Sequence, residues 1–196
     1  MPDSTSHAVV GVVLQVRRGR LVPTVQRVER GAAEPLEAAL GRAIDVAGLA
    51  YVEQLETRVL RDGTLATAYL GLVRADAEVS QETASLAPDE RELVAAAQAR
   101  LRAKLSYTNV GFALAPETFT ISELREIYVA ALGHDVSATN LQRVLVRRGV
   151  LARVEGRRAP GRSGGRPAAL YRFTSRRLEI TDEFAALRPP GSRASG

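Results

Sequence analysis

The apolar residues of the first 50 positions follow two patterns, one typical of strands and one of a helix. A continuous β-branched run at 7–16 and an extended pattern at 21–29 are separated by a short glycine-containing turn, which predicts a β-hairpin. Apolar residues then recur at helical spacing from 35 to 48, with Pro35 in the first turn and Gly48 as the expected C-cap. This part of the chain therefore predicts two strands followed by a helix.

Two further strands are predicted at 50–60 and 64–76, on either side of a tight turn. The turn contains Asp62-Gly63, a pair that favours the backbone conformation of a two-residue hairpin. The resulting order β-β-α-β-β predicts an α+β domain in which a sheet and a helix share one core.

The second half begins with two predicted helices. Residues 88–105 have acids near the start and bases near the end, which suits the helix dipole. The next helix follows Phe119, where Glu123 stands three residues after Thr120 and completes a capping box, and it ends at Gly133.

A third helix at 139–148 is followed by two predicted strands, 150–156 and 168–174. An arginine-rich and glycine-rich stretch at 156–166 joins these strands. Helix, helix and hairpin with a basic tip is the plan of a winged helix-turn-helix domain. The chain is therefore predicted to contain an α+β sheet domain and a C-terminal winged helix.

The predicted organisation has four parts. A sheet domain at 1–80 is followed by a linker and connecting helix at 81–114, a winged helix at 115–180 and a disordered tail at 181–196, which is rich in Pro, Gly and Ser.

Charge is distributed unevenly along the chain, although the whole sequence carries only +5. Between Arg143 and Arg177 there are eleven arginines and one acid, Glu155, so this stretch carries +10 and the remainder −5. Such asymmetry indicates a polyanionic partner for one part of the chain.

Candidate contacts to nucleic acid lie on the third helix and on the hairpin tip. Asn, Gln and Arg match base edges in the major groove, and arginines on a glycine-rich tip neutralise phosphates or enter the minor groove. The predicted DNA-binding residues are Asn140, Gln142, Arg143, Arg147, Arg148, Arg157, Arg158, Arg162 and Arg166. RNA is the less favoured polyanion because the tip has no aromatic residue for base stacking. For each element alone, the alternative is a basic surface that is merely solvated.

Composition excludes several other kinds of chemistry. The chain has no cysteine and two histidines, so disulfides, thiol nucleophiles and His/Cys metal sites are not expected. No apolar run is long enough to span a bilayer, and the N-terminus lacks the pattern of a signal peptide, so we expect a cytoplasmic protein.

Residues 99–173 resemble the C-terminal half of the Nudix-related transcriptional regulators, the NrtR family. The matching pieces are "LRAKLSYT", "FTISELREIY" followed by "LG", "NLQR" and "GRPAALYRF". The resemblance implies a Nudix-like N-terminal domain that senses a nucleotide effector such as ADP-ribose. It also implies a winged helix that binds double-stranded DNA and represses genes, usually as a homodimer.

The first half departs from the carboxylate pattern of a Nudix hydrolase. Residues 48–49 fit the end of that motif, but Asp45 and Val46 replace its paired glutamates, and Gly41 and Arg42 replace its Arg-Glu pair. Divalent cations need several such oxygen ligands. We therefore predict no catalytic residue, no metal site and no resident cofactor. The alternative is a pyrophosphohydrolase acting on ADP-ribose-like nucleotides, and a third hypothesis is an adaptor whose basic hairpin binds an acidic protein.

Overall fold

The computed structural model describes residues 6–45, 48–78, 85–158 and 167–182, without the side chain of Arg157. The chain divides into two compact units, Met1–Leu101 and Arg102–Gly196. Among the described residues, no helix combines the length and the apolar character that a membrane span requires.

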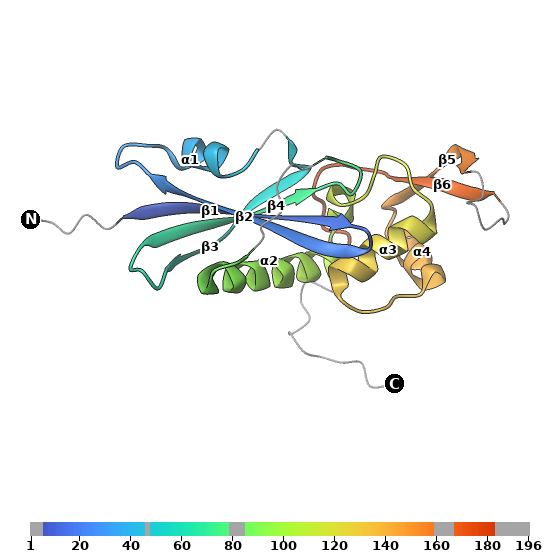
Figure 1. Ribbon diagram of the computed structural model, residues 1–196. Helices are drawn as coiled ribbons and strands as arrows, with labels where there is room; N and C mark the ends of the chain where they lie inside the picture. The colour runs from blue at the N-terminus through green and yellow to red at the C-terminus, as the bar shows by residue number, and fades with distance from the viewer. Residues whose placement is uncertain (1–5, 46–47, 79–84, 159–166, 183–196) are drawn as a thin grey trace, which may run out of the picture. The chain divides into compact units, whose positions relative to one another are not determined.

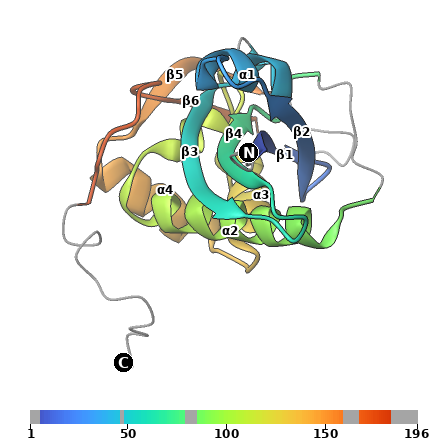
Figure 2. The ribbon, with the colours of Figure 1, turned by 90° about the vertical axis from the view of Figure 1, so that its left-hand side faces the viewer.

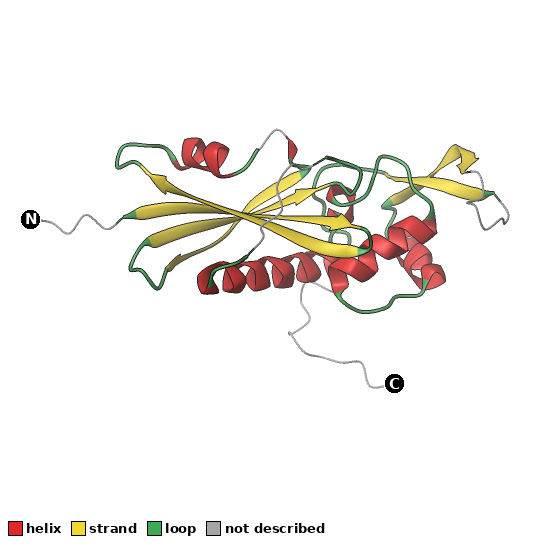
Figure 3. Ribbon diagram, in the orientation of Figure 1, coloured by secondary structure: helices red, strands yellow, loops and turns green. Residues whose placement is uncertain are grey.

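The first unit is built on a four-stranded mixed sheet (Figures 1 and 3). Its strands are β1 (His7–Arg17), β2 (Arg20–Arg30), β3 (Tyr51–Val59) and β4 (Leu65–Val73), in the spatial order β2-β1-β4-β3. The hairpins β1–β2 and β3–β4 are antiparallel, whereas β1 and β4 pair in parallel. Both predicted hairpins are confirmed.

Strand β1 is buried on both faces, which explains why its sequence is a continuous apolar run rather than an alternating one. Val9 and Val13 pack on the side of the first helix. Gly11 lies on the same face, where a Cβ would come within 2.5 Å of the Ile44 side chain. Only glycine allows the chain after the helix to approach the sheet so closely.

Helix α1 (Leu36–Ala43) is shorter than predicted. Ile44 follows it in an extended conformation, with φ −146° and ψ 144°, and packs against Val13 and Val73 of the sheet. The prediction that the helix ends at Gly48 is therefore wrong: burying Ile44 in the sheet requires extended backbone four residues before that glycine.

Helix α2 (Pro88–Tyr107) begins in the first unit, where α1 and α2 cover opposite faces of the sheet (Figure 2). Its first turn is joined to the β3–β4 turn, since the Arg61 guanidinium contacts Asp89 at 3.0 Å and also binds Glu92. Because Arg61 and Glu92 are about half exposed, we assign the packing of α2 mainly to Leu93, Ala97 and other buried apolar residues.

The β3–β4 turn gives the stability of the first unit a defined pH dependence. The Thr64 backbone N–H donates to Asp62 at 2.9 Å and Arg27 donates to it at 2.8 Å, and these bonds lower the pKa of the Asp62 carboxyl from 3.8 to about 2. A lowered pKa in the folded state stabilises the fold above about pH 4, and this contribution disappears as the pH falls toward 2.

We therefore expect Asp62→Asn to lower the free energy of unfolding above pH 4 and to converge with the unmodified chain near pH 2. Urea unfolding between pH 2 and pH 6 measures this difference, with Asp76→Asn in another turn of the unit as the control. Curves for Asp62→Asn and the unmodified chain that stay parallel across the range would contradict the assignment.

The second unit contains a short 3-10 helix η2 (Val110–Ala113), helices α3 (Ile121–Leu132) and α4 (Ala138–Arg147), and strands β5 (Leu151–Arg158) and β6 (Ala168–Phe173). Strands β5 and β6 form an antiparallel hairpin. The predicted order of two helices and a hairpin is confirmed (Figure 1).

The local signals for α3 are present as predicted. Thr120 accepts from the Glu123 backbone N–H while the Glu123 carboxylate accepts from the Thr120 N–H, which completes the capping box. Gly133 caps the other end in the left-handed conformation, with φ 78°. Leu124 and Ile127 of this helix are buried in the core of the unit.

Candidate DNA-binding surface

Helix α4 is held in place by its N-cap and by its buried face. The Ser137 hydroxyl accepts from the Asn140 backbone N–H at the start of the helix. Leu141 and Leu145 are almost fully buried. Burying this face fixes which side of α4 is turned toward solvent.

The side of α4 opposite the core carries five exposed residues, none of which is acidic. We call these residues the outward face of α4: Thr139, Asn140, Arg143, Val146 and Arg147. No acidic residue occurs anywhere in the helix. Arg143 donates to the Asn140 side chain at 2.8 Å, so the two side chains are oriented together. An exposed helix with paired donors and acceptors and no negative charge suits the major groove of DNA.

Gln142 lies beside this face and connects it to the hairpin. Its side-chain amide donates to the Tyr171 hydroxyl of β6 at 3.0 Å, and both residues are half-buried. The amide therefore fixes α4 relative to β6 before any ligand is bound. Along β6, the half-buried Tyr171 and the buried Phe173 alternate with the exposed Arg172.

Arg148 lies inside the unit. Its side chain is 12% exposed, and it donates to the Ser106 carbonyl oxygen at 2.6 Å and to Asp182 at 3.1 Å. Arg148 is one of the predicted DNA contacts, but the end of α4 turns its guanidinium toward the end of α2 and toward Asp182.

The loop end of the hairpin is attached to α3 through Arg158, the last residue of β5. Its guanidinium contacts Glu123 at 2.7 Å and the Thr118 carbonyl oxygen at 3.4 Å. Glu123 thus serves both the capping box and the hairpin. The backbone of Arg157 pairs with Ala169 in the same hairpin. The predicted contacts Arg162 and Arg166 lie outside the described residues.

Contacts of Phe119 with β6 also join the hairpin to the core formed by the helices. The backbones of Phe119 and Tyr171 exchange hydrogen bonds of 3.0 and 2.8 Å, so an isolated β-bridge joins the chain before α3 to β6. The Phe119 and Phe173 rings lie 5.5 Å apart at a tilted angle. Helices α3 and α4 and the hairpin therefore form one body with α4 on its surface.

Two residues of the outward face, Thr139 and Val146, were not among the sequence predictions. Neither is an Asn, Gln or Arg residue, the types on which the predicted contacts to base edges depend. The signal that finds them is rotation along the helix, since about 100° per residue places both nearly opposite Leu141 and Leu145.

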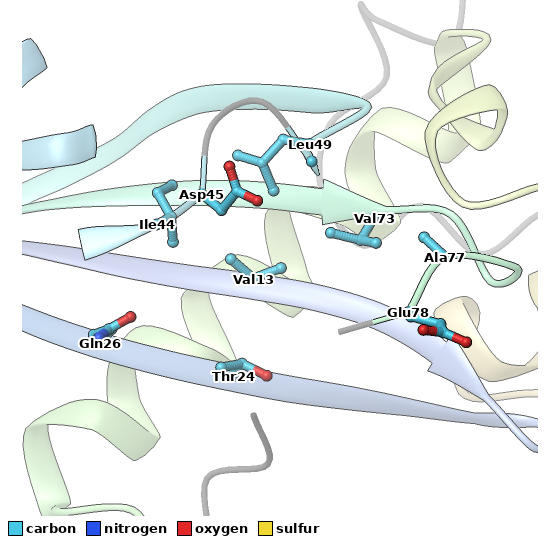
Figure 4. A pocket seen from close by; sticks show the side chains of 10 residues that line it. Val13, Thr24, Gln26, Ile44, Asp45, Leu49, Val73, Ala77 and Glu78 are labelled. Carbon is cyan, nitrogen blue, oxygen red and sulfur yellow. The ribbon is translucent and has the colours of Figure 1, made fainter. Parts of the chain in front are cut away.

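A separate cavity of about 300 Å³ opens on the first unit (Figure 4). Its apolar lining includes Val13, Ile44 and Val73, and its polar groups include the carboxylates of Asp45 and Glu78. Figure 4 shows these two carboxylates apart, with Val73 between them in the view. None of the described residues that line the cavity is Lys, Arg or His.

The donor set of this cavity does not fit the divalent cations of a Nudix hydrolase. Such cations require several convergent oxygen ligands. Asp45 lies after the end of α1 and Glu78 follows β4. Among the described residues, no group of three or more His, Cys, Asp or Glu side chains is arranged to hold a metal ion.

Comparison with known proteins identifies the domain that carries α4. Residues 111–173 match the family model of the NrtR DNA-binding winged helix domain. The ADPR responsive transcriptional repressor NtrR of Acinetobacter baylyi is 38% identical over 88 residues, which cover 45% of this chain and 34% of that protein. The matched part thus spans about a third of the length of this curated relative.

Solved structures share the fold over most of the chain. Shewanella oneidensis NrtR in complex with a 27mer DNA has a TM-score of 0.64 at 23% identity, covering 85% of this chain and 92% of that chain. A second structure of Shewanella oneidensis NrtR has a TM-score of 0.65 at 21% identity, covering 85% of this chain and 93% of that chain. A MutT/nudix family protein from Enterococcus faecalis gives 0.64 at 15% identity, with coverage of 89% and 90%.

These similarities define the class of the protein as an α+β chain with a Nudix-like sheet unit and a winged helix, which confirms the predicted fold class. The predicted resemblance to the Nudix-related transcriptional regulators is also confirmed. Residues 111–173 form a winged helix domain that is similar to the NrtR DNA-binding domain.

Proposed function

We propose that this chain is a transcriptional repressor that binds double-stranded DNA in a sequence-specific manner. Helix α4 enters the major groove, and the β5–β6 hairpin contacts the flanking backbone or the minor groove. Relatives with this domain are named as NrtR and as an ADPR responsive transcriptional repressor, and one of them was solved with DNA.

The observation that carries the proposal is the composition of the outward face of α4. Two arginines and an asparagine project from a helix with no acidic residue, and the buried side of that helix fixes their direction. Asn140, Arg143 and Arg147 are the predicted contacts that we retain on α4. Gln142, Arg148 and Arg158 are assigned positioning roles, because their polar groups already bind other parts of the unit.

We further propose that the repressor acts as a homodimer. A single α4 reads only a few base pairs, whereas two copies related by a twofold axis read two half-sites about one helical turn apart. The operator should therefore contain an inverted repeat.

Selection from a random pool of duplex DNA tests the proposed function. The full chain should enrich one motif with dyad symmetry, and its complex should persist in the presence of competitor DNA. Equal retention of all sequences would overturn the proposal and would favour the adaptor hypothesis, in which a basic surface binds acidic partners through charge alone.

The first unit is proposed to be catalytically inactive. Its cavity offers two separated carboxylates where hydrolysis of a pyrophosphate requires a cluster of them to hold divalent cations. We expect no magnesium-dependent release of AMP from ADP-ribose above the rate in buffer, measured by chromatography of the reaction mixture. Turnover that depends on both protein and magnesium would establish the alternative, a Nudix-type pyrophosphohydrolase.

The lining of the same cavity also indicates whether the first unit binds a nucleotide effector. The Acinetobacter baylyi relative is named as ADPR responsive. Here the described lining of the cavity includes the carboxylates of Asp45 and Glu78 and no Lys, Arg or His, a composition that does not favour the two phosphates of ADP-ribose. We expect ADP-ribose up to millimolar concentration to leave the Tm unchanged, because only a ligand that binds the folded state raises it. A concentration-dependent rise in Tm would show that the effector is retained.

A further inference from the structure

The outward face of α4 is divided into two flanks with different chemistry. With about 100° of rotation per residue, Arg143 lies opposite the midpoint between Leu141 and Leu145. Thr139 and Val146 fall within about 60° of Arg143 on one side, and Asn140 and Arg147 fall within about 60° on the other. One flank therefore carries methyl groups and the other carries polar groups, with Arg143 between them.

Val146 is the unusual member of this face. Its exposed fraction is 49%. Among the described residues, only three other large hydrophobic side chains are exposed to this degree or nearly so. A β-branched residue at an exposed helical position gains nothing from burial and lowers helix propensity. Its neighbours on the outward face are polar or charged, so Val146 is not the edge of the buried stripe. An apolar group on a binding partner would remove this side chain from water.

The major groove of DNA offers one such group. Thymine presents its 5-methyl carbon there, and side-chain methyl groups of the kind that Thr and Val carry can pack against it. Thr139 and Val146 are seven residues apart, which corresponds to about 10 Å along the helix axis. Base pairs are about 3.4 Å apart, so the two methyl-bearing side chains span about three base-pair steps.

We propose that Thr139 and Val146 determine specificity by contacting thymine methyl groups on either side of a guanine that Arg143 reads. The inference rests on the proposed function and deepens it by specifying part of the half-site. Asn140 and Arg147, on the opposite flank, contact the neighbouring base edge and the phosphate backbone. Arg143 is already held toward this flank by its hydrogen bond with Asn140.

The test uses operator DNA in which single thymines are replaced by uracil, which removes only the 5-methyl group. One thymine should depend on Val146: its replacement should weaken binding by the unmodified chain about fourfold, the effect of losing one buried methyl group. Val146→Ala should bind the thymine operator about fourfold more weakly and lose nothing further on that uracil. Fluorescence anisotropy with the full chain measures all four affinities.

Thr139→Ser provides a second, independent arm, because it removes the methyl group and keeps the hydroxyl. It should become insensitive to uracil at a different thymine, about three base pairs from the first. Val59→Ala is the matched control, since Val59 is 66% exposed and lies in the first unit. It should respond to every uracil as the unmodified chain does.

The outcomes separate the two proposals. If random-pool selection yields no motif, the proposed function and this inference fail together. If a motif is enriched but no uracil weakens the unmodified chain, only the inference fails. It also fails if Val146→Ala and Thr139→Ser lose the same factor as the unmodified chain at every thymine, because the side chain and the methyl group then act independently.

Discussion

The double substitution Arg143→Ala and Arg147→Ala is expected to lower the affinity for the operator by about 100-fold. Each arginine on the outward face of α4 supplies a contact to bases or phosphates of about 1–3 kcal/mol, and the loss of about 3 kcal/mol corresponds to that factor. Binding to unrelated DNA should fall much less, since it depends on charge alone. The preference for the operator should therefore nearly disappear, as measured by anisotropy titration.

A charge-matched control distinguishes base reading from electrostatics. Arg18→Ala with Arg20→Ala removes the same two charges from the exposed β1–β2 turn of the first unit. We expect this variant to keep its preference for the operator over a scrambled duplex. If both double variants lose the same factor on both duplexes, the outward face of α4 does not read sequence.

Leu145→Ala should cause the largest loss of stability in the second unit. Leu145 is 2% exposed and holds α4 against the core, so truncation leaves a cavity that costs about 2–5 kcal/mol. Native domains have only about 5–15 kcal/mol in total. We expect a marked shift of the urea midpoint and weaker operator binding at temperatures where the unit begins to unfold.

The neighbouring residue provides the matched control for this loss. Val146→Ala removes apolar carbon atoms one position along the same helix, but from a side chain that is 49% exposed. Its free energy of unfolding should change by less than about 0.5 kcal/mol. Equal destabilisation by both substitutions would show that α4 is not oriented as described.

Much of the fold could be predicted because local patterns and tertiary packing agree. The run that became β1 is apolar on both faces because helices cover both, and Asp62-Gly63 forms the turn between β3 and β4. Thr120 and Glu123 form the capping box that their spacing predicts. At the end of α1 the local pattern and the tertiary packing disagree. There, burial of Ile44 against the sheet determines the extended backbone conformation.

The roles of individual site residues were harder to predict because their partners are distant in sequence. Arg148 binds Asp182, 34 residues away, and Arg158 binds Glu123, 35 residues away. Nothing in the local pattern separates these arginines from Arg143, whose hydrogen-bond partner is on the same helix. Residue type alone therefore could not show which arginines of the second unit bind other parts of that unit.

Methylation interference on the selected operator tests the central claim, that α4 reads base edges in the major groove. Methylation of guanine N7 blocks a major-groove acceptor that Arg143 is proposed to bind. The account predicts that one guanine in each half-site abolishes binding when methylated, and that Arg143→Ala no longer distinguishes it. Binding that is unaffected by N7 methylation at every operator guanine would contradict the account.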